Sequence, residues 1–219
     1  MRLAAITPIR VPEEELARRQ ARYDRLAPPP VRVRLLNLDD PDAPTALNTA
    51  ADVRRSEELV VAAARDLEPG SYDGVLPDCV LDPGVERLTR EAPLPVCGML
   101  RLTGGFLAGH GVVYGSVTRN PAIGDELDDR LRAYRLDSAF VGNAVLDLDF
   151  AAVADDARWN AALRDVVAGL AGRGARAVIN GCSAVDVADD GSGPDAVVVE
   201  PTALALRLVA AGWTEGLFG

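Results

Sequence analysis

The chain has 219 residues, of which 48% are hydrophobic, and a formal net charge of −10 at pH 7. This supplies enough apolar material for one compact domain or two small lobes, whereas the acidic balance disfavours a nucleic-acid surface, which needs clustered cations. The apolar runs are too short to span a membrane and no charged start leads into a signal core, so we expect a soluble, cytoplasmic protein.

The lysine and cysteine content excludes several classes of catalytic and binding site. All 23 basic residues are arginine, which excludes pyridoxal-phosphate chemistry through a lysine imine and a phosphate loop ending in Gly-Lys-Ser/Thr. The three cysteines include no Cys-x-x-Cys pair, and the single histidine, His110, lies in a glycine-rich turn. We therefore expect reduced thiols, no metal site and no cofactor, and a Cys–His nucleophile has no local support.

Strand-like and helix-like segments alternate along the chain, which is typical of an α/β fold with mostly parallel strands. In the first half we predict a strand at 3–7, a polar helix at 12–26, a strand at 31–38, a helix at 52–66 and a buried strand ending before Cys79. In the second half we predict a strand at 111–118, a helix at 125–134, a strand at 144–150, a helix at 155–172 and a strand at 175–181 ending before Cys182. The chain closes with a polar loop at 186–196, a strand at 197–201 and a helix at 202–212.

Each half therefore has the same order, with a threonine ending the first strand and a cysteine following the third. This order indicates a duplication into two pseudo-symmetric, Rossmann-like lobes. We assign residues 1–100, completed by 201–219, to the first lobe and residues 101–200 to the second. The carboxyl ends of strands in open α/β sheets are where such folds bind ligands.

The cysteines differ in their surroundings. A free cysteine most often packs as a small apolar side chain, and Cys97, inside the apolar run "PLPVCGML", fits that interpretation. Cys79 and Cys182 are instead flanked by polar and turn residues, and each holds the same place in its half. A helix N-terminus beside each thiol would favour the thiolate.

Two thiols that face one ligand from opposite sides suit a proton transfer at carbon. One, as thiolate, removes a proton from one face, and the other, as thiol, returns a proton to the opposite face. The charge on the intermediate then needs donors near its carbonyl. The candidates are the backbone N–H groups that follow the cysteines, at Val80 and Ser183, and the hydroxyls of Ser183 and Thr118.

Four segments carry a resemblance to a known family. "DCVLDPGVERLTREAPLPVCGM" (78–99) resembles the first cysteine block of the hydantoin racemases, and "AVINGCSAV" (177–185) resembles their second. "YGSVTRNP" (114–121) is similar to the segment that opens their second lobe, and "VVVEPTALALRL" (197–208) to their closing strand and helix. The larger group includes aspartate and glutamate racemases, allantoin racemase, maleate isomerase and arylmalonate decarboxylase.

The resemblance implies two α/β lobes related by a pseudo-twofold axis, with the active site in the cleft between them. It implies catalysis by Cys79 and Cys182 without a cofactor. It also implies that Thr118 contacts the substrate, and that Thr7 and the adjacent Pro8 do so from the corresponding loop of the first lobe.

The chain also departs from the family pattern. Glutamate racemases follow the second cysteine with Thr-His, where this chain has Ser183 and Ala184, which disfavours glutamate as substrate. Arg10 and Arg119 stand where hydantoin racemases usually have asparagine and threonine. Arg119 is suited to clamp a carboxylate, or it is a solvent-facing loop arginine.

We therefore predict a cofactor-independent racemase or epimerase acting on a hydantoin-like or small carboxylate substrate. A maleate-type cis–trans isomerase or a decarboxylase of the same group is the nearest alternative. A non-catalytic, two-lobed small-ligand-binding protein is the alternative from another class. We expect a small molecule as partner, with no nucleic acid and no membrane, and the alternation in "VRVRLL" permits a homo-oligomer.

Overall fold

The computed structural model of the chain describes residues 1–187 and 196–218. The chain divides into two compact units, unit 1 (Met1–Leu102 and Thr202–Gly219) and unit 2 (Thr103–Pro201). Unit 1 contains a sheet of order β2-β1-β3, unit 2 one of order β5-β4-β6-β7, and every strand pair is parallel. The predicted α/β class with parallel sheets is confirmed.

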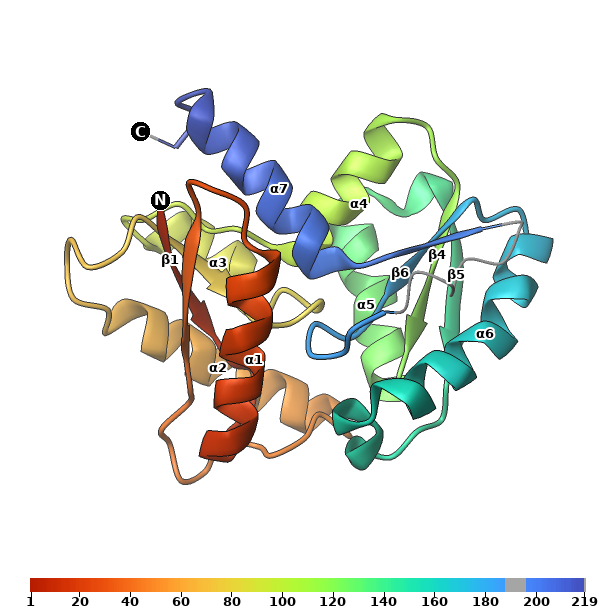
Figure 1. The fold of residues 1–219 in the computed structure, drawn as a ribbon, viewed down its shortest axis with the longest axis horizontal. Coiled ribbons are helices and arrows are strands. Elements are labelled where there is room, and N and C mark those ends of the chain that lie inside the picture. Colours follow the sequence, from red (N-terminus) through yellow and green to blue (C-terminus); the bar gives the residue numbers. More distant parts are fainter. Residues whose placement is uncertain (188–195, 219) are drawn as a thin grey trace. The chain divides into compact units, whose positions relative to one another are not determined.

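Unit 1 buries its sheet on both faces. Its strands are β1 (Arg2–Ile6), β2 (Arg32–Leu36) and β3 (Gly74–Pro77), and its helices include α1 (Glu13–Leu26), α2 (Ala50–Arg65) and α3 (Val85–Glu91). Figure 1 shows α1 on one face of this sheet and α2 on the other. Because side chains alternate along a strand, Leu3 packs in the cluster on the α1 side, whereas Ile6 packs in the cluster with α2.

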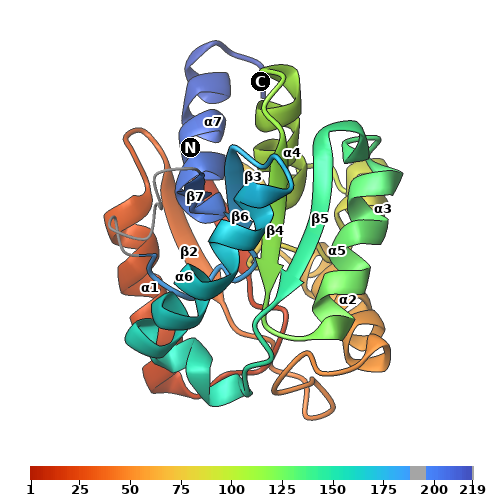
Figure 2. The same cartoon turned by 90° about the vertical axis from the view of Figure 1, so that its right-hand side faces the viewer.

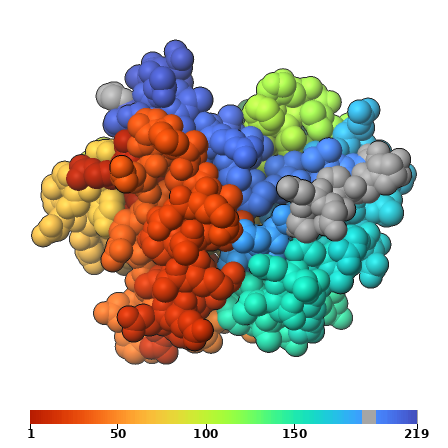
Figure 3. Space-filling model, viewed as in Figure 1, coloured from red at the N-terminus to blue at the C-terminus, as the bar shows by residue number. Residues whose placement is uncertain are grey.

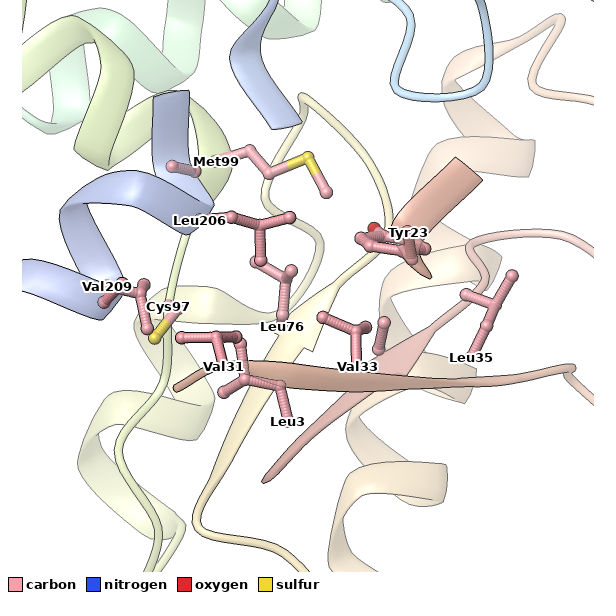
Figure 4. Close-up of a cluster of buried hydrophobic side chains, with 13 residues drawn as sticks. Leu3, Tyr23, Val31, Val33, Leu35, Leu76, Cys97, Met99, Leu206 and Val209 are labelled. Atoms are coloured by element: carbon pink, nitrogen blue, oxygen red, sulfur yellow. The ribbon is translucent and has the colours of Figure 1, made fainter. Parts of the chain in front are cut away.

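The cluster on the α1 side also takes in helix α7 (Pro201–Thr214) from the end of the chain. Figure 4 shows Leu206 and Val209 of α7 beside Leu76 of β3 and Leu3 of β1. At roughly 25 cal/mol per Å² of apolar surface, burying such side chains contributes about 2 kcal/mol each. The C-terminal helix is thus part of the core of unit 1.

Strand β2 lies at the edge of its sheet, and helix α1 covers part of that edge. The amide of Gln20 donates to the Val33 carbonyl at 2.9 Å and accepts from the Leu35 N–H at 2.8 Å, so it replaces a neighbouring strand. A surface groove of about 760 Å³, lined by residues of α1 and β2 and by the turn between them, lies here. The face of unit 1 formed by α1 is seen in the space-filling view (Figure 3). A second copy of the chain could therefore pair with β2 through Val33 and Leu35 only if Gln20 moved aside.

Unit 2 has strands β4 (Tyr114–Thr118), β5 (Phe140–Val145), β6 (Ala177–Asn180) and β7 (Val197–Val199), with helices α5 (Pro121–Ala133) and α6 (Asp156–Gly172). Figure 2 shows the sheet with α6 in front of it. Leu163, Val167 and Leu170 form the buried stripe of α6, packed against Val117 and Val178 of the sheet. The i, i+4, i+7 spacing of these three residues already indicates such a stripe in the sequence of the predicted helix at 155–172.

Several predicted boundaries are wrong. The strand predicted at 144–150 lies at Phe140–Val145, and Asp149 instead caps a short 3₁₀ helix, η2 (Phe150–Ala154), by accepting from the Ala152 N–H. Helix α5 begins at Pro121 rather than 125, because Asn120 caps it and proline suits the first helical turn.

Two further segments differ from the prediction. Helix α4 (Met99–Gly109) was not predicted, and it occupies the chain up to just before the predicted strand at 111–118. Most of the predicted loop at 186–196 lies outside the described residues. None of the described helices is long and apolar enough to cross a membrane.

Candidate active site

In unit 1 a threonine and a cysteine lie at the same edge of the sheet. In the β1–β3 pairing Ile6 lies opposite Pro77, and the Asp78 N–H extends the ladder by donating to the Ile6 carbonyl at 2.8 Å. Thr7 and Cys79 are the next residues on the two strands. Both therefore stand at the carboxyl ends of neighbouring parallel strands, where open α/β sheets bind ligands. We call Thr7, Pro8, Cys79 and Val80 the Cys79 site.

Unit 2 repeats this register. Val117 lies opposite Asn180 in the β4–β6 pairing, and the Gly181 N–H donates to the Val117 carbonyl at 2.8 Å. Thr118 and Cys182 then follow, as Thr7 and Cys79 do in unit 1. We call Thr118, Arg119, Cys182 and Ser183 the Cys182 site. The repeat predicted from the sequence is thus confirmed at the level of backbone register.

The Cys79 sulfur is held by a tight turn rather than by a helix. The Leu81 N–H donates to Cys79 Sγ at 3.5 Å, and the Cys79 N–H donates to the Pro77 carbonyl at 2.8 Å. Helix α3 begins only at Val85, so the helix N-terminus expected beside this thiol is absent. The donor to sulfur is Leu81, which the sequence reading missed. Cys79 itself is 9% exposed.

The Asp-Pro-Gly motif after Cys79 anchors this turn. The fully buried Asp82 accepts from the Leu100 N–H at 3.0 Å and the Arg101 N–H at 2.9 Å, and so caps the first turn of α4. Gly98 leaves room for it, since a Cβ there would lie 2.4 Å from Asp82 Oδ2. Glycine is required at position 84 for two reasons: its φ of +72° is unfavourable for other residues, and a Cβ there would lie 2.5 Å from a Val61 methyl group. The motif is therefore a structural clamp on the loop of Cys79.

Asp78, just before Cys79, is held by helix α1. Tyr23 donates its hydroxyl to Asp78 Oδ1 at 2.7 Å, and Arg19 Nη1 lies 3.6 Å from Asp78 Oδ2. Arg19 also donates to Glu15 at 2.6 Å, and the residues around Asp78 are almost fully buried. By its place just before Cys79, Asp78 could orient the thiol or cap a helix, and the cap does not apply because α3 begins only at Val85.

The Cys182 backbone is fixed by a different pair. Asn180 donates from Nδ2 to the Cys182 carbonyl at 3.0 Å and accepts from Trp159 Nε1 at 3.0 Å. Trp159 is fully buried on α6 and belongs to the cluster that also contacts the partly exposed Cys182. No helix starts after Cys182 in the described chain up to residue 187. The asparagine and tryptophan together set the position of this thiol.

Both threonine hydroxyls are buried and contact asparagines. Thr7 Oγ1 donates to Asn37 Oδ1 at 3.2 Å and accepts from the Leu38 N–H. Thr118 Oγ1 accepts from Asn143 Nδ2 at 2.8 Å and donates to the Asn120 carbonyl at 3.4 Å. The sequence reading did not single out Asn37 or Asn143.

Arg119 lies at the Cys182 site and is only 5% exposed, so the solvent-facing interpretation is wrong. Its Nη1 donates to the Leu148 carbonyl at 3.2 Å, and its guanidinium lies 5.7 Å from the centre of the Phe150 ring. Burial lowers the pKa of Arg119 below its ordinary value, and negative charge on Cys182 and Asp149 opposes that shift. Burial and these two acidic groups therefore shift the pKa of Arg119 in opposite directions.

The remaining residues considered in the sequence analysis, Cys97, His110 and Arg10, lie outside the two cysteine sites. Cys97 belongs to the core of unit 1, where burial raises the pKa of its thiol to about 11, as expected for a packing cysteine. His110 is exposed and its Nδ1 hydrogen-bonds with the Phe106 carbonyl at 2.8 Å. Arg10 is exposed. Within residues 1–187 and 196–218, no three His, Cys, Asp or Glu side chains are grouped so that they could hold a metal ion.

Two parallel α/β units, each with a cysteine following a strand, define the class of fold. Solved structures of other proteins share it, and three of them are described here. An allantoin racemase from Pseudomonas fluorescens is 14% identical with a TM-score of 0.86, covering 99% of this chain and 92% of its own. An allantoin racemase from Klebsiella pneumoniae is 18% identical with a TM-score of 0.84, covering 99% and 89%. A maleate isomerase from Pseudomonas putida is 14% identical with a TM-score of 0.67, covering 98% and 92%.

The family model for Asp/Glu/Hydantoin racemase matches residues 18–209. The chain belongs to this family and is a racemase-type isomerase. A search of curated proteins finds no match.

Proposed function

We propose that the protein is a cofactor-independent racemase or epimerase in which Cys79 and Cys182 transfer protons at a carbon next to a carbonyl. The observation that carries this proposal is the shared register of the two units, which sets a thiol beside a threonine at equivalent strand ends. Two equivalent thiols suit a reaction whose two directions are mirror images. Membership in the racemase family supports the same reaction class.

In the proposed cycle a thiolate takes the proton from the substrate carbon and becomes a thiol. The electron pair of the broken C–H bond moves onto the carbonyl oxygen, giving an enolate. The opposite thiol then gives its proton to the other face of the carbon and becomes the thiolate. The charge of enzyme and substrate together is unchanged, and no oxidant or reductant is consumed.

The enolate needs donors, and each site offers some. We assign this role to the backbone N–H groups of Val80 and Ser183, the Ser183 hydroxyl and the threonine hydroxyls. The O–H···O distances of 3.2 Å from Thr7 and 3.4 Å from Thr118 are longer than those of strong hydroxyl bonds. Each proton can therefore turn toward a bound oxygen at little cost. The Asn143 amide keeps the Thr118 oxygen in place while it does so.

For the substrate we propose a hydantoin-like ring or a small carboxylate, bound by Thr7, Pro8, Val80, Thr118, Arg119 and Ser183. Two of the structures with this fold are allantoin racemases, and allantoin is a substituted hydantoin. The buried Arg119 adds a donor pair that fits either a ring carbonyl or a carboxylate. The first substrates to test are thus allantoin, 5-substituted hydantoins and small amino acids.

Exchange in heavy water tests the proposal. A racemase incorporates deuterium at the stereocentre while optical rotation falls, whereas a maleate-type isomerase changes double-bond geometry and a decarboxylase releases carbon dioxide. We expect Cys79→Ser and Cys182→Ser each to lower turnover by about 10² or more, as for a lost acid–base group. Cys97→Ala is the matched control and should racemise as the wild type does.

The result that would overturn the proposal is full turnover in either site variant. Binding of these compounds without any exchange, isomerisation or decarboxylation would instead support a non-catalytic binding protein.

A further inference from the structure

We propose that Asn143 is a positioning residue for the reaction: its side-chain amide directs the hydroxyl proton of Thr118 toward the bound substrate, and Ser116 sets the direction of that amide. The catalytic meaning of this proposal rests on the proposed function, in which Thr118 donates to the enolate oxygen. The hydrogen bonds themselves can be measured without turnover.

A β-bulge brings Asn143 to its place. Strand β5 pairs with β4 (Figure 2), and their register shifts between Tyr114 and Ser116, so that Asn143 lies opposite Ser116. Just before it, Gly142 has φ +112°, a backbone conformation that glycine adopts readily. Because a shift of one residue turns a strand's side chains to the other face of the sheet, the bulge aims Asn143 at the face that carries Ser116 and Thr118.

The Asn143 amide is held at both of its ends. Its Oδ1 accepts from the Ser116 hydroxyl at 2.9 Å, and its Nδ2 donates to Thr118 Oγ1 at 2.8 Å. Ser116 and Thr118 are both fully buried, which strengthens their hydrogen bonds to the amide. Because an amide nitrogen only donates, the Thr118 oxygen is the acceptor in this bond, and the Thr118 proton must point elsewhere.

Helix α5 leaves room for this pair of side chains because residue 124 is glycine. A Cβ at Gly124 would lie 2.5 Å from Asn143 Nδ2 and 3.1 Å from Thr118 Oγ1. The Gly124 N–H donates to the Asn120 carbonyl at 3.1 Å, and the Thr118 hydroxyl donates to the same carbonyl at 3.4 Å. That carbonyl therefore keeps a partner from the helix when the Thr118 proton turns to a substrate oxygen.

The asparagine beside Thr7 in unit 1 faces the other way. Asn37 Oδ1 accepts from the Thr7 hydroxyl at 3.2 Å. The backbone of Val11 fixes this amide, since its N–H donates to Asn37 Oδ1 at 3.1 Å and its carbonyl accepts from Nδ2 at 2.8 Å. The Thr7 proton thus has an amide oxygen as acceptor, whereas Thr118 has an amide donor behind its oxygen. We expect Thr118 to be the stronger hydroxyl donor toward a substrate.

NMR of the side-chain amides tests the hydrogen bonds without turnover. In protein made with isotopically labelled asparagine, the Asn143 signal is identified by its loss in Asn143→Asp. Its bonded amide proton should exchange with water more slowly than those of Asn48, which is exposed in the loop before α2. Thr118→Val removes the acceptor and should speed the exchange at Asn143 by about tenfold. Exchange as fast as at Asn48, or unchanged in Thr118→Val, would overturn the proposal.

Turnover of Asn143→Asp tests the role of the amide. An ionised carboxylate accepts from Thr118 and turns its proton away from the substrate. We expect kcat to fall by about 10-fold to 100-fold with KM nearly unchanged, because the lost bond forms with the enolate. A protonated carboxyl donates as the amide does, so kcat relative to wild type should recover as the pH falls. Asn48→Asp adds the same charge at an exposed position and should match the wild type at every pH.

A double variant shows whether Asn143 acts through Thr118. Once Thr118→Val has removed the hydroxyl, Asn143→Asp should lower kcat no further. If Asn143→Asp does not fold, Ser116→Ala replaces it: this change frees the amide to turn over and should lower kcat by about threefold, again only when Thr118 is present.

Losses that add up in the double variant would overturn the proposal, and so would wild-type kcat in Asn143→Asp. If the wild type itself exchanges no deuterium with any substrate, the proposed function fails instead. The amide exchange rates still decide, in that case, whether Asn143 is bound to Thr118.

Discussion

The clamp that Asp82 forms on α4 allows a quantitative test of how the Cys79 loop is held. Asp82→Ala removes the carboxylate that accepts hydrogen bonds from the backbone N–H groups of Leu100 and Arg101, and leaves both donors without that acceptor. Hydrogen bonds to a charged group contribute about 1.5–3 kcal/mol each, so the two contribute about 3–6 kcal/mol before the cost of burying the carboxylate is subtracted. We expect the free energy of unfolding of unit 1 to fall by about 3 kcal/mol.

Hydrogen exchange and urea denaturation measure this loss. A cost of 3 kcal/mol corresponds to about a hundredfold faster exchange of the Leu100 and Arg101 amides in their native-state opening. Asp82→Asn keeps one acceptor and tolerates the φ of +50° at this position, so it should lie between wild type and alanine. Asp165→Ala, on the exposed face of α6, is the control and should change stability by less than about 0.5 kcal/mol. If Asp82→Ala costs no more than that control, the clamp does not hold the loop.

Two other measurements follow from the structure. A Cβ at Gly181 would lie 2.2 Å from a backbone carbonyl of β4. Gly181→Ala should therefore lower the free energy of unfolding by about 1–3 kcal/mol, and the melting temperature with it. Gly169→Ala on α6, where a Cβ would meet no atom within 4 Å, is the control and should leave the melting temperature unchanged. Burial raises the pKa of the Cys97 thiol from 9.0 to about 11, so between these pH values the folded state keeps a proton that the unfolded chain loses. The free energy of unfolding should therefore fall by about 2–3 kcal/mol as the pH rises from 9 toward 11. Urea denaturation at several pH values measures this decline, which Cys97→Ala should flatten.

The positions of the two thiols could be predicted because they depend on local patterns. Short apolar runs that end in turn residues mark the ends of buried strands, and the same order of elements occurs twice. Neither signal needs knowledge of distant contacts. The stripe at Leu163, Val167 and Leu170 was equally local, since it follows from the helical period alone.

The strand predicted at 144–150 was wrong because the alternating apolar residues there pack into the core from a loop and a 3₁₀ helix. Leu146, Leu148 and Phe150 pack beside Cys182 and Trp159 from a loop and a 3₁₀ turn, so their spacing resembles a strand without forming one. Only the tertiary position of the tryptophan distinguishes the two cases.

The residues that hold each thiol could not be predicted because their partners are far away in the chain. Asp78 is 55 residues from Tyr23, and Asn180 is 21 residues from Trp159. Local rules allow two roles for Asp78, orienting the thiol or capping a helix. Its hydrogen bond to α1 decides against the cap, and no pattern in the sequence encodes that contact.

In both units the backbone register determines where the thiol lies, whereas the side chains around the thiol differ between the units. The ladder hydrogen bonds that end at Ile6 and Val117 are equal in length, so the duplicated backbone alone places both sulfurs at equivalent strand ends. The residues beside them were then able to diverge without moving the thiols, and they did so at the position of Pro8 and Arg119. Changes at the ladder, such as a side chain at Gly181, should therefore displace a thiol, whereas changes at Arg119 should leave the Cys182 backbone in place. A variant of Arg119 that shifted the Cys182 backbone as much as one at Gly181 would show that this separation does not hold.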